Sequence, residues 1–139
     1  MFPALDISAS GLAAQRMRMQ AISSNIANIS TTHNEDGRRV PYQPRFVVFQ
    51  TDDGIGAHGA SGVSVSAVQT ADVEPLWRFQ PNHPERMKDG PHKDHVAYPN
   101  VNMMTEYTDA MEAARAYEAN LGTMEITKDL QRQTLRILA

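Results

Sequence analysis

The histidines are the side chains of this sequence best suited to bind a metal, and there are five of them: His33, His58, His83, His92 and His95. All five fall in predicted loops, and none belongs to the helical pair of histidines around a glutamate that zinc hydrolases use. His92 and His95, with Asp89 and Asp94 beside them, are the best candidates for weak binding of a transition metal. Because an ordinary polar loop has the same composition, we predict no metal site.

Motifs for nucleophilic catalysis and phosphate binding are also missing from the sequence. It contains no Gly-rich loop followed by Lys and Ser or Thr, and no Gly-x-Ser-x-Gly elbow. It contains no cysteine, which excludes disulfides and thiolate chemistry and leaves the redox compartment open. Glu112, Glu118 and Glu125 fall on predicted helix surfaces, where contact with water explains them. We therefore expect no active site and no cofactor, and predict that the chain is not an enzyme.

Length and charge indicate one small domain with neither a nucleic-acid nor a membrane partner. The chain has 139 residues and a mass of 15.4 kDa, and its net charge of −3 with scattered Lys and Arg lacks the basic surface that follows a phosphate backbone. No apolar run approaches the roughly 20 residues that span a bilayer, so membrane insertion is not expected. The first 20 residues predict an amphipathic helix instead of a cleavable secretory signal, so any export signal would stay attached.

Residues 101–138 predict one long helix around which the chain is organised. No proline follows Pro99, and Asn100 or Asn102 is a suitable N-cap. Apolar side chains recur every three or four residues, with interruptions at Lys128 and Gln131, which is a heptad pattern. Its members are Met103, Tyr107, Ala110, Ala114, Tyr117, Leu121, Met124, Leu135 and Leu138. A helix of about 37 residues is about 55 Å long, more than the rest of such a chain can cover, so its apolar stripe needs a partner.

The first 29 residues carry a matching heptad pattern. Its members are Leu5, Leu12, Met19, Ile22, Ile26 and Ile29. We expect this helix to begin near Asp6 or Ser8, whose side-chain oxygens can accept free amide groups. Asn25 and Asn28 near its end can cap carbonyls, bridge to a neighbour, or simply lie in solvent. The two apolar stripes fit an intramolecular hairpin or packing between subunits, and their spacing does not separate these alternatives.

Between the two helices the sequence predicts loops and short strands. Residues 40–50 predict an edge strand entered through prolines, residues 63–68 alternate as in a half-buried strand, and residues 76–79 offer a third strand. A glycine-rich turn over residues 52–62 and a Pro-rich loop over residues 81–91 separate them, and a short apolar run covers residues 96–98.

The predicted fold class is α+β, with long terminal helices that pair as a coiled-coil-like rod domain around a small β-rich insert. We expect one structural domain with three parts: an assembly helix over residues 1–30, the insert over residues 31–100, and a second assembly helix over residues 101–139.

Three stretches resemble one family of bacterial proteins: ISASGLAAQRMRMQAISSNIANISTT from Ile7, GVSVSAV from Gly62, and HVAYPNVNMMTEYTDAMEAARAYEANL from His95. The first and third are similar to the flagellar rod and hook proteins. The amino end of those proteins carries a small-residue, Asn-rich helix, and their carboxyl end carries Arg, Ala, Tyr, Glu or Gln, Ala, Asn. Here that run is Arg115 to Asn120. The short insert and the run from Ala97 to Asn102 resemble subunits of the proximal rod of the flagellar basal body.

This resemblance implies a structural subunit of the proximal rod that transmits torque together with other axial proteins. It implies export from the cytoplasm by the flagellar type III system and a place in the rod, in the periplasmic space. The implied partners are other rod proteins, the export and ring components of the basal body, and copies of the chain itself. Another rod subunit of the same family and a helical-hairpin adaptor unrelated to flagella are the alternatives, and a secreted metal-dependent enzyme is a more distant one.

The resemblance also implies that the terminal helices pair and pack against those of other subunits. The residues predicted for this assembly interface are Leu5, Leu12, Met19, Ile22, Asn25, Ile26, Asn28, Met103, Tyr107, Ala114, Tyr117, Asn120, Leu121, Met124 and Leu135.

Overall fold

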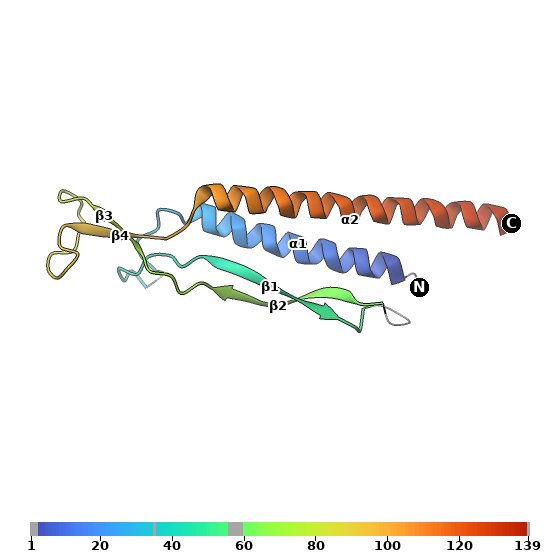
Figure 1. The fold of residues 1–139 in the computed structure, drawn as a ribbon, viewed down its shortest axis with the longest axis horizontal. Coiled ribbons are helices and arrows are strands. Elements are labelled where there is room, and N and C mark those ends of the chain that lie inside the picture. Colours follow the sequence, from blue (N-terminus) through green and yellow to red (C-terminus); the bar gives the residue numbers. More distant parts are fainter. Residues whose placement is uncertain (1–2, 35, 56–59, 139) are drawn as a thin grey trace.

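Two long helices flank an insert of short strands in the computed structural model, which describes residues 3–34, 36–55 and 60–138. The elements are α1 (Pro3–Ala27), β1 (Arg45–Asp52), β2 (Gly62–Thr70), β3 (Leu76–Phe79), β4 (His95–Tyr98) and α2 (Met103–Leu138). Helix α1 lies between α2 and the β1–β2 hairpin, and the β3–β4 hairpin lies beyond the start of α2 (Figure 1). The α+β class and the order helix, insert, helix are confirmed. Part of the expected turn over residues 52–62, and the side chain of Leu138, fall outside the described part.

Helix α1 begins at Pro3, earlier than the expected start near Asp6 or Ser8. Proline fits a first turn because it has no backbone N–H to leave unpaired. Ala4 and Leu5, which precede the expected caps, are themselves strong helix formers. Asp6 therefore lies inside the first turn, at the positive end of the helix dipole, and Ser8 is buried within the helix. An N-cap at either residue is wrong for this reason.

Helix α2 runs unbroken through 36 residues from Met103. The side-chain oxygen of Asn102 accepts hydrogen bonds from the amides of Met104 at 3.0 Å and Thr105 at 3.4 Å, which confirms Asn102 as the N-cap. At 1.5 Å per residue the helix is about 54 Å long. Figure 1 shows that it runs past the amino-terminal end of α1.

The two helices are antiparallel, and two contacts define their register. Asn25 of α1 bonds to Glu106 of α2, and Gly11 of α1 lies against Asn120 of α2, so both helices have the same spacing of 14 residues between these contacts (25 minus 11, and 120 minus 106). The same register places Pro3 opposite about residue 128. The last turns of α2 therefore have no part of α1 opposite them.

The contact line on α2 lies one residue away from much of the expected apolar stripe. Ala113, the neighbour of Ala114, is 0% exposed. Asn120, the neighbour of Leu121, is the residue that lies against Gly11. The small Ala113 on α2 and the absent side chain of Gly11 on α1 let the two helix backbones approach closely. These contacts do not establish the knobs-into-holes packing of a coiled coil.

Strands β1 and β2 form an antiparallel hairpin that packs along α1, with a bulge between Val48 and Phe49. Ser10 of α1 fixes the hairpin to the helix, because its hydroxyl oxygen accepts a hydrogen bond from the amide of Val63 at 3.1 Å. A Cβ atom on the preceding Gly62 would lie only 3.0 Å from that hydroxyl oxygen. It would also lie 2.8 Å from Cγ2 of Ile55, so at this position only glycine fits without a shift of the neighbouring side chains.

Strands β3 and β4 form a second antiparallel hairpin, separate from the first sheet. The strands expected over residues 63–68 and 76–79 correspond to β2 and β3, and the apolar run over residues 96–98 belongs to β4. The strand expected from Val40 begins only at Arg45. Pro41 and Pro44 explain the later start, because neither has an amide to donate to a strand partner.

Candidate assembly surface

Asn25, near the end of α1, joins three parts of the fold. Its Nδ2 donates to Oε1 of Glu106 at 3.0 Å and to the carbonyl of Arg45 at 2.9 Å. Its Oδ1 accepts from the amide of Arg45 at 2.8 Å and from the hydroxyl of Tyr42 at 3.0 Å. The residue is 3% exposed and all four hydrogen-bonding positions of its amide are used. Its role is to bridge neighbouring elements, and a solvated helix end is wrong for this residue.

Glu106 brings a carboxylate into this junction. Partial burial raises the pKa of Glu106 above its ordinary value of 4.5, the hydrogen bond from Asn25 lowers it, and the negative charge of Asp109 raises it again. Close by, Nη2 of Arg18 lies 3.5 Å from Oδ1 of Asp109 and 3.2 Å from Oε2 of Glu112. Ion pairs as exposed as these contribute little stability. The amide of Asn25, not the ion pairs, therefore holds the helix ends in register.

Asn28 and Asn120 use their amides within their own helices. Nδ2 of Asn28 donates to the carbonyl of Ser24 at 2.9 Å, which caps the end of α1 as one of the expected roles. Nδ2 of Asn120 donates to the carbonyl of Ala116, also at 2.9 Å. This bond holds the Asn120 side chain flat against its helix, where Gly11 leaves room for it.

Leu12 of α1 and Tyr117 of α2 meet in a shallow hollow beside the helix contact, which we call the Leu12–Tyr117 hollow. Ala9, Ala13 and Arg16 complete its lining. Leu12 and Tyr117 are both half-buried, so each leaves part of its apolar surface open to the outside. The structure thus brings together two residues that were predicted separately from the two ends of the chain.

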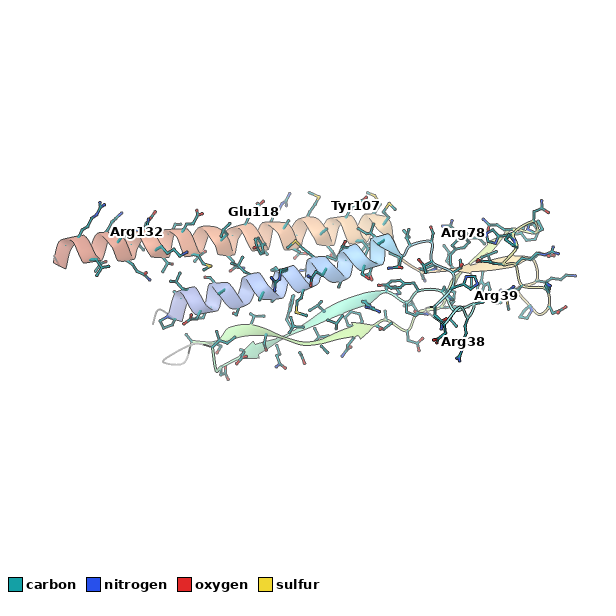
Figure 2. All side chains as sticks on the ribbon, turned by 180° about the vertical axis from the view of Figure 1, so that it is seen from behind. Arg38, Arg39, Arg78, Tyr107, Glu118 and Arg132 are labelled. Carbon is teal, nitrogen blue, oxygen red and sulfur yellow. The ribbon has the colours of Figure 1, made fainter. Side chains whose placement is uncertain are left out.

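Two groups of exposed apolar side chains lie at opposite ends of α2. The first, the amino-terminal patch, has exposures from 42% to 74% and consists of Met103, Met104, Tyr107 and Met111. The second belongs to the overhang, which we define as residues 129–138; here the exposures run from 59% to 84% at Leu130, Leu135 and Ile137. Figure 2 shows Tyr107 near the start of α2 and Arg132 on the part that runs past α1. Apolar surface of this extent often marks a binding site.

The residues predicted for the assembly interface lie in three environments. Ile22 and Asn25 are buried inside the subunit. Half-buried positions are Leu5, Leu12, Met19, Ile26, Asn28, Ala114, Tyr117, Asn120 and Met124. Exposed positions are Met103, Tyr107, Leu121 and Leu135. Burial within one subunit does not test contact with another, so the interface stays a prediction.

The predicted interface omits five large apolar side chains that α2 exposes. They are Met104, Met111, Ile126, Leu130 and Ile137. All of them lie off the heptad stripe, on faces that the pattern assigns to water. The sequence could have identified them by their size. A large apolar side chain on an otherwise charged helix face indicates a contact outside the subunit.

The loop histidines contact aromatic rings. His92 stacks on Trp77 with the ring centroids 4.0 Å apart, and His95 meets Phe79 edge to face at 5.3 Å. Within the described ranges, no group of three or more His, Cys, Asp or Glu is placed to hold a metal ion. No helix among the described residues is both long and apolar enough to cross a bilayer.

Two family models match the two ends of the chain. The model described as flagella basal body rod protein matches residues 5–33, and the model described as flagellar basal body rod FlgEFG protein C-terminal matches residues 93–137. These ranges contain most of α1 and α2. Both terminal helices thus carry the sequence pattern of the flagellar rod proteins, and this is the class to which the fold belongs.

Relatives of nearly equal length narrow this class. The flagellar basal-body rod protein FlgC of Borreliella burgdorferi is 36% identical, over 99% of this chain and 97% of that protein. The FlgC proteins of Bacillus subtilis and Salmonella typhimurium are 34% and 33% identical, over 98% and 95% of this chain and 97% and 93% of their own lengths. The chain belongs to the FlgC family of flagellar basal-body rod proteins, and it is a structural subunit of the rod.

Proposed function

We propose that this subunit enters the proximal rod by packing its exposed helix surfaces against the helices of other axial subunits. The observation that carries the proposal is the overhang of α2. Leu130, Leu135 and Ile137 are at least 59% exposed there, and the helix register leaves no part of α1 to cover them.

Burial of this surface would supply the free energy of docking. Covering one Leu or Ile side chain fully contributes about 1.5 to 3 kcal/mol. A few helical turns alone in water are marginal, because backbone entropy opposes them and no packed face compensates. A partner that covers the overhang would therefore both order it and gain binding energy.

The Leu12–Tyr117 hollow and the amino-terminal patch would extend the same surface along the helices. Tyr107 and Leu121 belong to the predicted heptad stripe, yet both lie beside the α1–α2 contact and are more than 40% exposed. This position supports coiled-coil-like packing between subunits, with the stripe facing a neighbour. The interface residues predicted from the sequence remain our proposal for that contact.

Family membership supports the finer parts of this proposal. The chain would be exported by the flagellar type III system with its amino end uncleaved, and would lie in the periplasmic part of the rod. Its partners would be other rod proteins, the export and ring components of the basal body, and copies of itself. The unbroken α2, about 54 Å long, would transmit torque as part of a stiff helical assembly.

Incorporation of hollow variants into basal bodies tests this proposal. Leu12→Asp and Tyr117→Ala are expressed in a strain that lacks the wild-type copy, and each protein is quantified in the secreted, periplasmic and basal-body pools. An aromatic ring can bury 150 to 250 Å². Loss of the Tyr117 ring should lower the share of the protein found in basal bodies about tenfold or more while secretion continues. Tyr117→Phe keeps the ring and should keep most of that share.

Glu118→Gln is the matched control at an exposed position of α2 outside the overhang, and it should be nearly silent. Tyr117→Ala protein present in basal bodies at the wild-type level would show that the hollow is not an assembly surface.

Dilution of the purified chain tests the alternative that the protein is a helical-hairpin adaptor. An adaptor that needs no neighbours would keep the full helix content of α2 as a monomer, whereas the overhang of a rod subunit should fray.

A further inference from the structure

We infer that Asp89 is a site at which the chain modifies itself. Its carboxyl group reacts with the amide of Gly90, and water then converts the residue to isoaspartate. An aspartate reacts most readily with its own backbone when glycine follows, because glycine has no Cβ that would hinder the amide nitrogen. The sequence contains three such pairs: Asp36–Gly37, Asp53–Gly54 and Asp89–Gly90. The fold favours the reaction at the last of them.

The reaction needs no reactant other than water. The amide nitrogen of Gly90 attacks Cγ of Asp89, and the new N–Cγ bond closes a five-membered succinimide ring while the amide proton and the carboxyl hydroxyl leave as water. A second water then opens the ring. If it breaks the new N–Cγ bond, Asp89 is restored. If it breaks the bond from the nitrogen to the main-chain carbonyl carbon, the chain continues through Cγ and the residue is isoaspartate, with no change in mass.

Hydrogen bonds to the attacking amide separate the three pairs. The amide of Gly37 donates to the carbonyl of Asn34 at 3.0 Å, and the amide of Gly54 donates to Oδ1 of Asp52 at 2.9 Å. The amide of Gly90 donates to no acceptor among the residues that the structure describes. An amide that is held by an acceptor must break that bond before it can attack. Ring closure should therefore be fastest at Gly90.

The surroundings of Gly90 leave room for the ring. Asp89 and Gly90 are both exposed, and no described atom lies within 4 Å of the position that a Cβ on Gly90 would occupy. Gly37 is equally open, so exposure alone does not select a site, and the free amide does. In the second pair the carboxylate is held as well, because Oδ1 of Asp53 accepts a hydrogen bond from the hydroxyl of Ser61 at 2.6 Å.

Isoaspartate adds one atom to the main chain of a closed loop. The amide of Met87 donates to the carbonyl of His95, and the amide of Asp94 donates to the carbonyl of Met87, both at 2.9 Å. The amide of Lys93 donates to the carbonyl of Gly90 at 3.2 Å, directly after the site. The isomer also leaves the former main-chain carboxylate as a short side group on this exposed loop. Methyltransferases that repair isoaspartate with S-adenosylmethionine recognise this group, so an enzyme of this class is the partner that the site fits.

Ageing of the purified full chain in warm, mildly acidic buffer tests the inference, at a pH where circular dichroism shows the chain folded. Labelling by an isoaspartate methyltransferase and peptide mass spectrometry quantify isoaspartate at each of the three pairs. Asp89 should form it at least about fivefold faster than Asp36 or Asp53, the factor that corresponds to one net hydrogen bond of about 1 kcal/mol. In guanidinium chloride all three amides are released, and the three rates should agree within about twofold.

Two variants test the chemistry and the role of the amide separately. Asp89→Glu keeps the charge but would need a six-membered ring, so labelling at this position should disappear. Asp52→Ala removes the acceptor of the Gly54 amide and should raise the rate at Asp53 about fivefold. The inference would be overturned by equal rates in the folded chain, by the absence of isoaspartate at Asp89, or by a preference for Asp89 that persists in guanidinium chloride. An unchanged rate at Asp53 in Asp52→Ala would also contradict it, because the amide hydrogen bond would then not protect.

Discussion

Asn25 shows how one polar side chain can fix the arrangement of three elements. Its amide bonds to the backbone of Arg45 at the start of β1, to Glu106 of α2 and to Tyr42, while Asn25 is almost fully buried. A buried amide with all of its partners stabilises one geometry, because any shift of the elements leaves donors and acceptors unpaired. Asn25 therefore helps to fix the register of the two helices.

Asn25→Ala should destabilise the purified chain by about 1 to 3 kcal/mol, because it leaves the amide and carbonyl of Arg45 without their partner in a part-buried site. Urea denaturation followed by circular dichroism measures this change. Asn28→Ala removes a cap at the same end of α1 and serves as the control, with a smaller expected loss of about 0.5 to 1 kcal/mol. An equal loss in the two variants would argue against a special role for Asn25.

The stability of the chain should depend on pH through Glu106. Its pKa is raised in the folded protein above the ordinary 4.5, so the folded state holds this proton more tightly than the unfolded chain. The stabilisation by the proton is complete below pH 4.5 and is lost as the pH rises through the raised folded pKa. Glu106→Gln is neutral at every pH and keeps an oxygen for Asn25. Its urea midpoint should match that of the wild type in acid and exceed it at neutral pH; a gain only in acid would contradict this sign.

At the scale of elements, the sequence predicted which segments are helical but not how they face each other. Periodic apolar residues over many turns identified both helices, and Asn102 identified the start of α2. The contact line was misplaced because Ala113 and Asn120 carry a weak apolar signal, whereas the stripe follows large residues. The Asn25 junction was not predictable, since its partners lie 20 and 81 residues away in the sequence.

Gly11 and Asn120 should be coupled across the helix contact. Alanine at position 11 favours a helix over glycine by about 1 kcal/mol. Its Cβ, however, would lie 3.0 Å from Nδ2 and 3.2 Å from Cγ of Asn120, which is tighter than ordinary packing. We expect Gly11→Ala to be nearly neutral alone and to stabilise an Asn120→Ala background by about 1 kcal/mol. A double-mutant cycle from urea denaturation measures the coupling, and the same effect in both backgrounds would show that the two side chains do not compete.

At the scale of the whole molecule, the three layers formed by α2, α1 and the β1–β2 hairpin should determine which backbone amides are protected from solvent. Helix α1 is covered by α2 on one side and by the β1–β2 hairpin on the other, while the overhang of α2 is covered by neither (Figure 1). The helix in the overhang should unfold locally with a small free-energy change, because few contacts are lost.

Amide hydrogen exchange of the purified chain checks this expectation. Amides after about residue 130 should exchange at least tenfold faster than those in the middle of α1, near Ala14 and Ile22, which are buried. In isolated basal bodies the same amides should become protected. Slow exchange of the overhang in the dilute monomer would contradict the assigned register and the need for a partner.

Both ends of the described chain lie at the same end of the molecule, and the loop between β3 and β4 lies at the opposite end (Figure 1). A fluorescent or epitope label fused to either terminus would therefore sit beside the overhang, where subunits are proposed to meet. A short label inserted between Pro81 and Pro91 would instead extend from an exposed loop far from both long helices. We therefore expect a subunit labelled in this internal loop to assemble and to be traceable in a living cell, which fluorescence at the basal body of a motile strain would check.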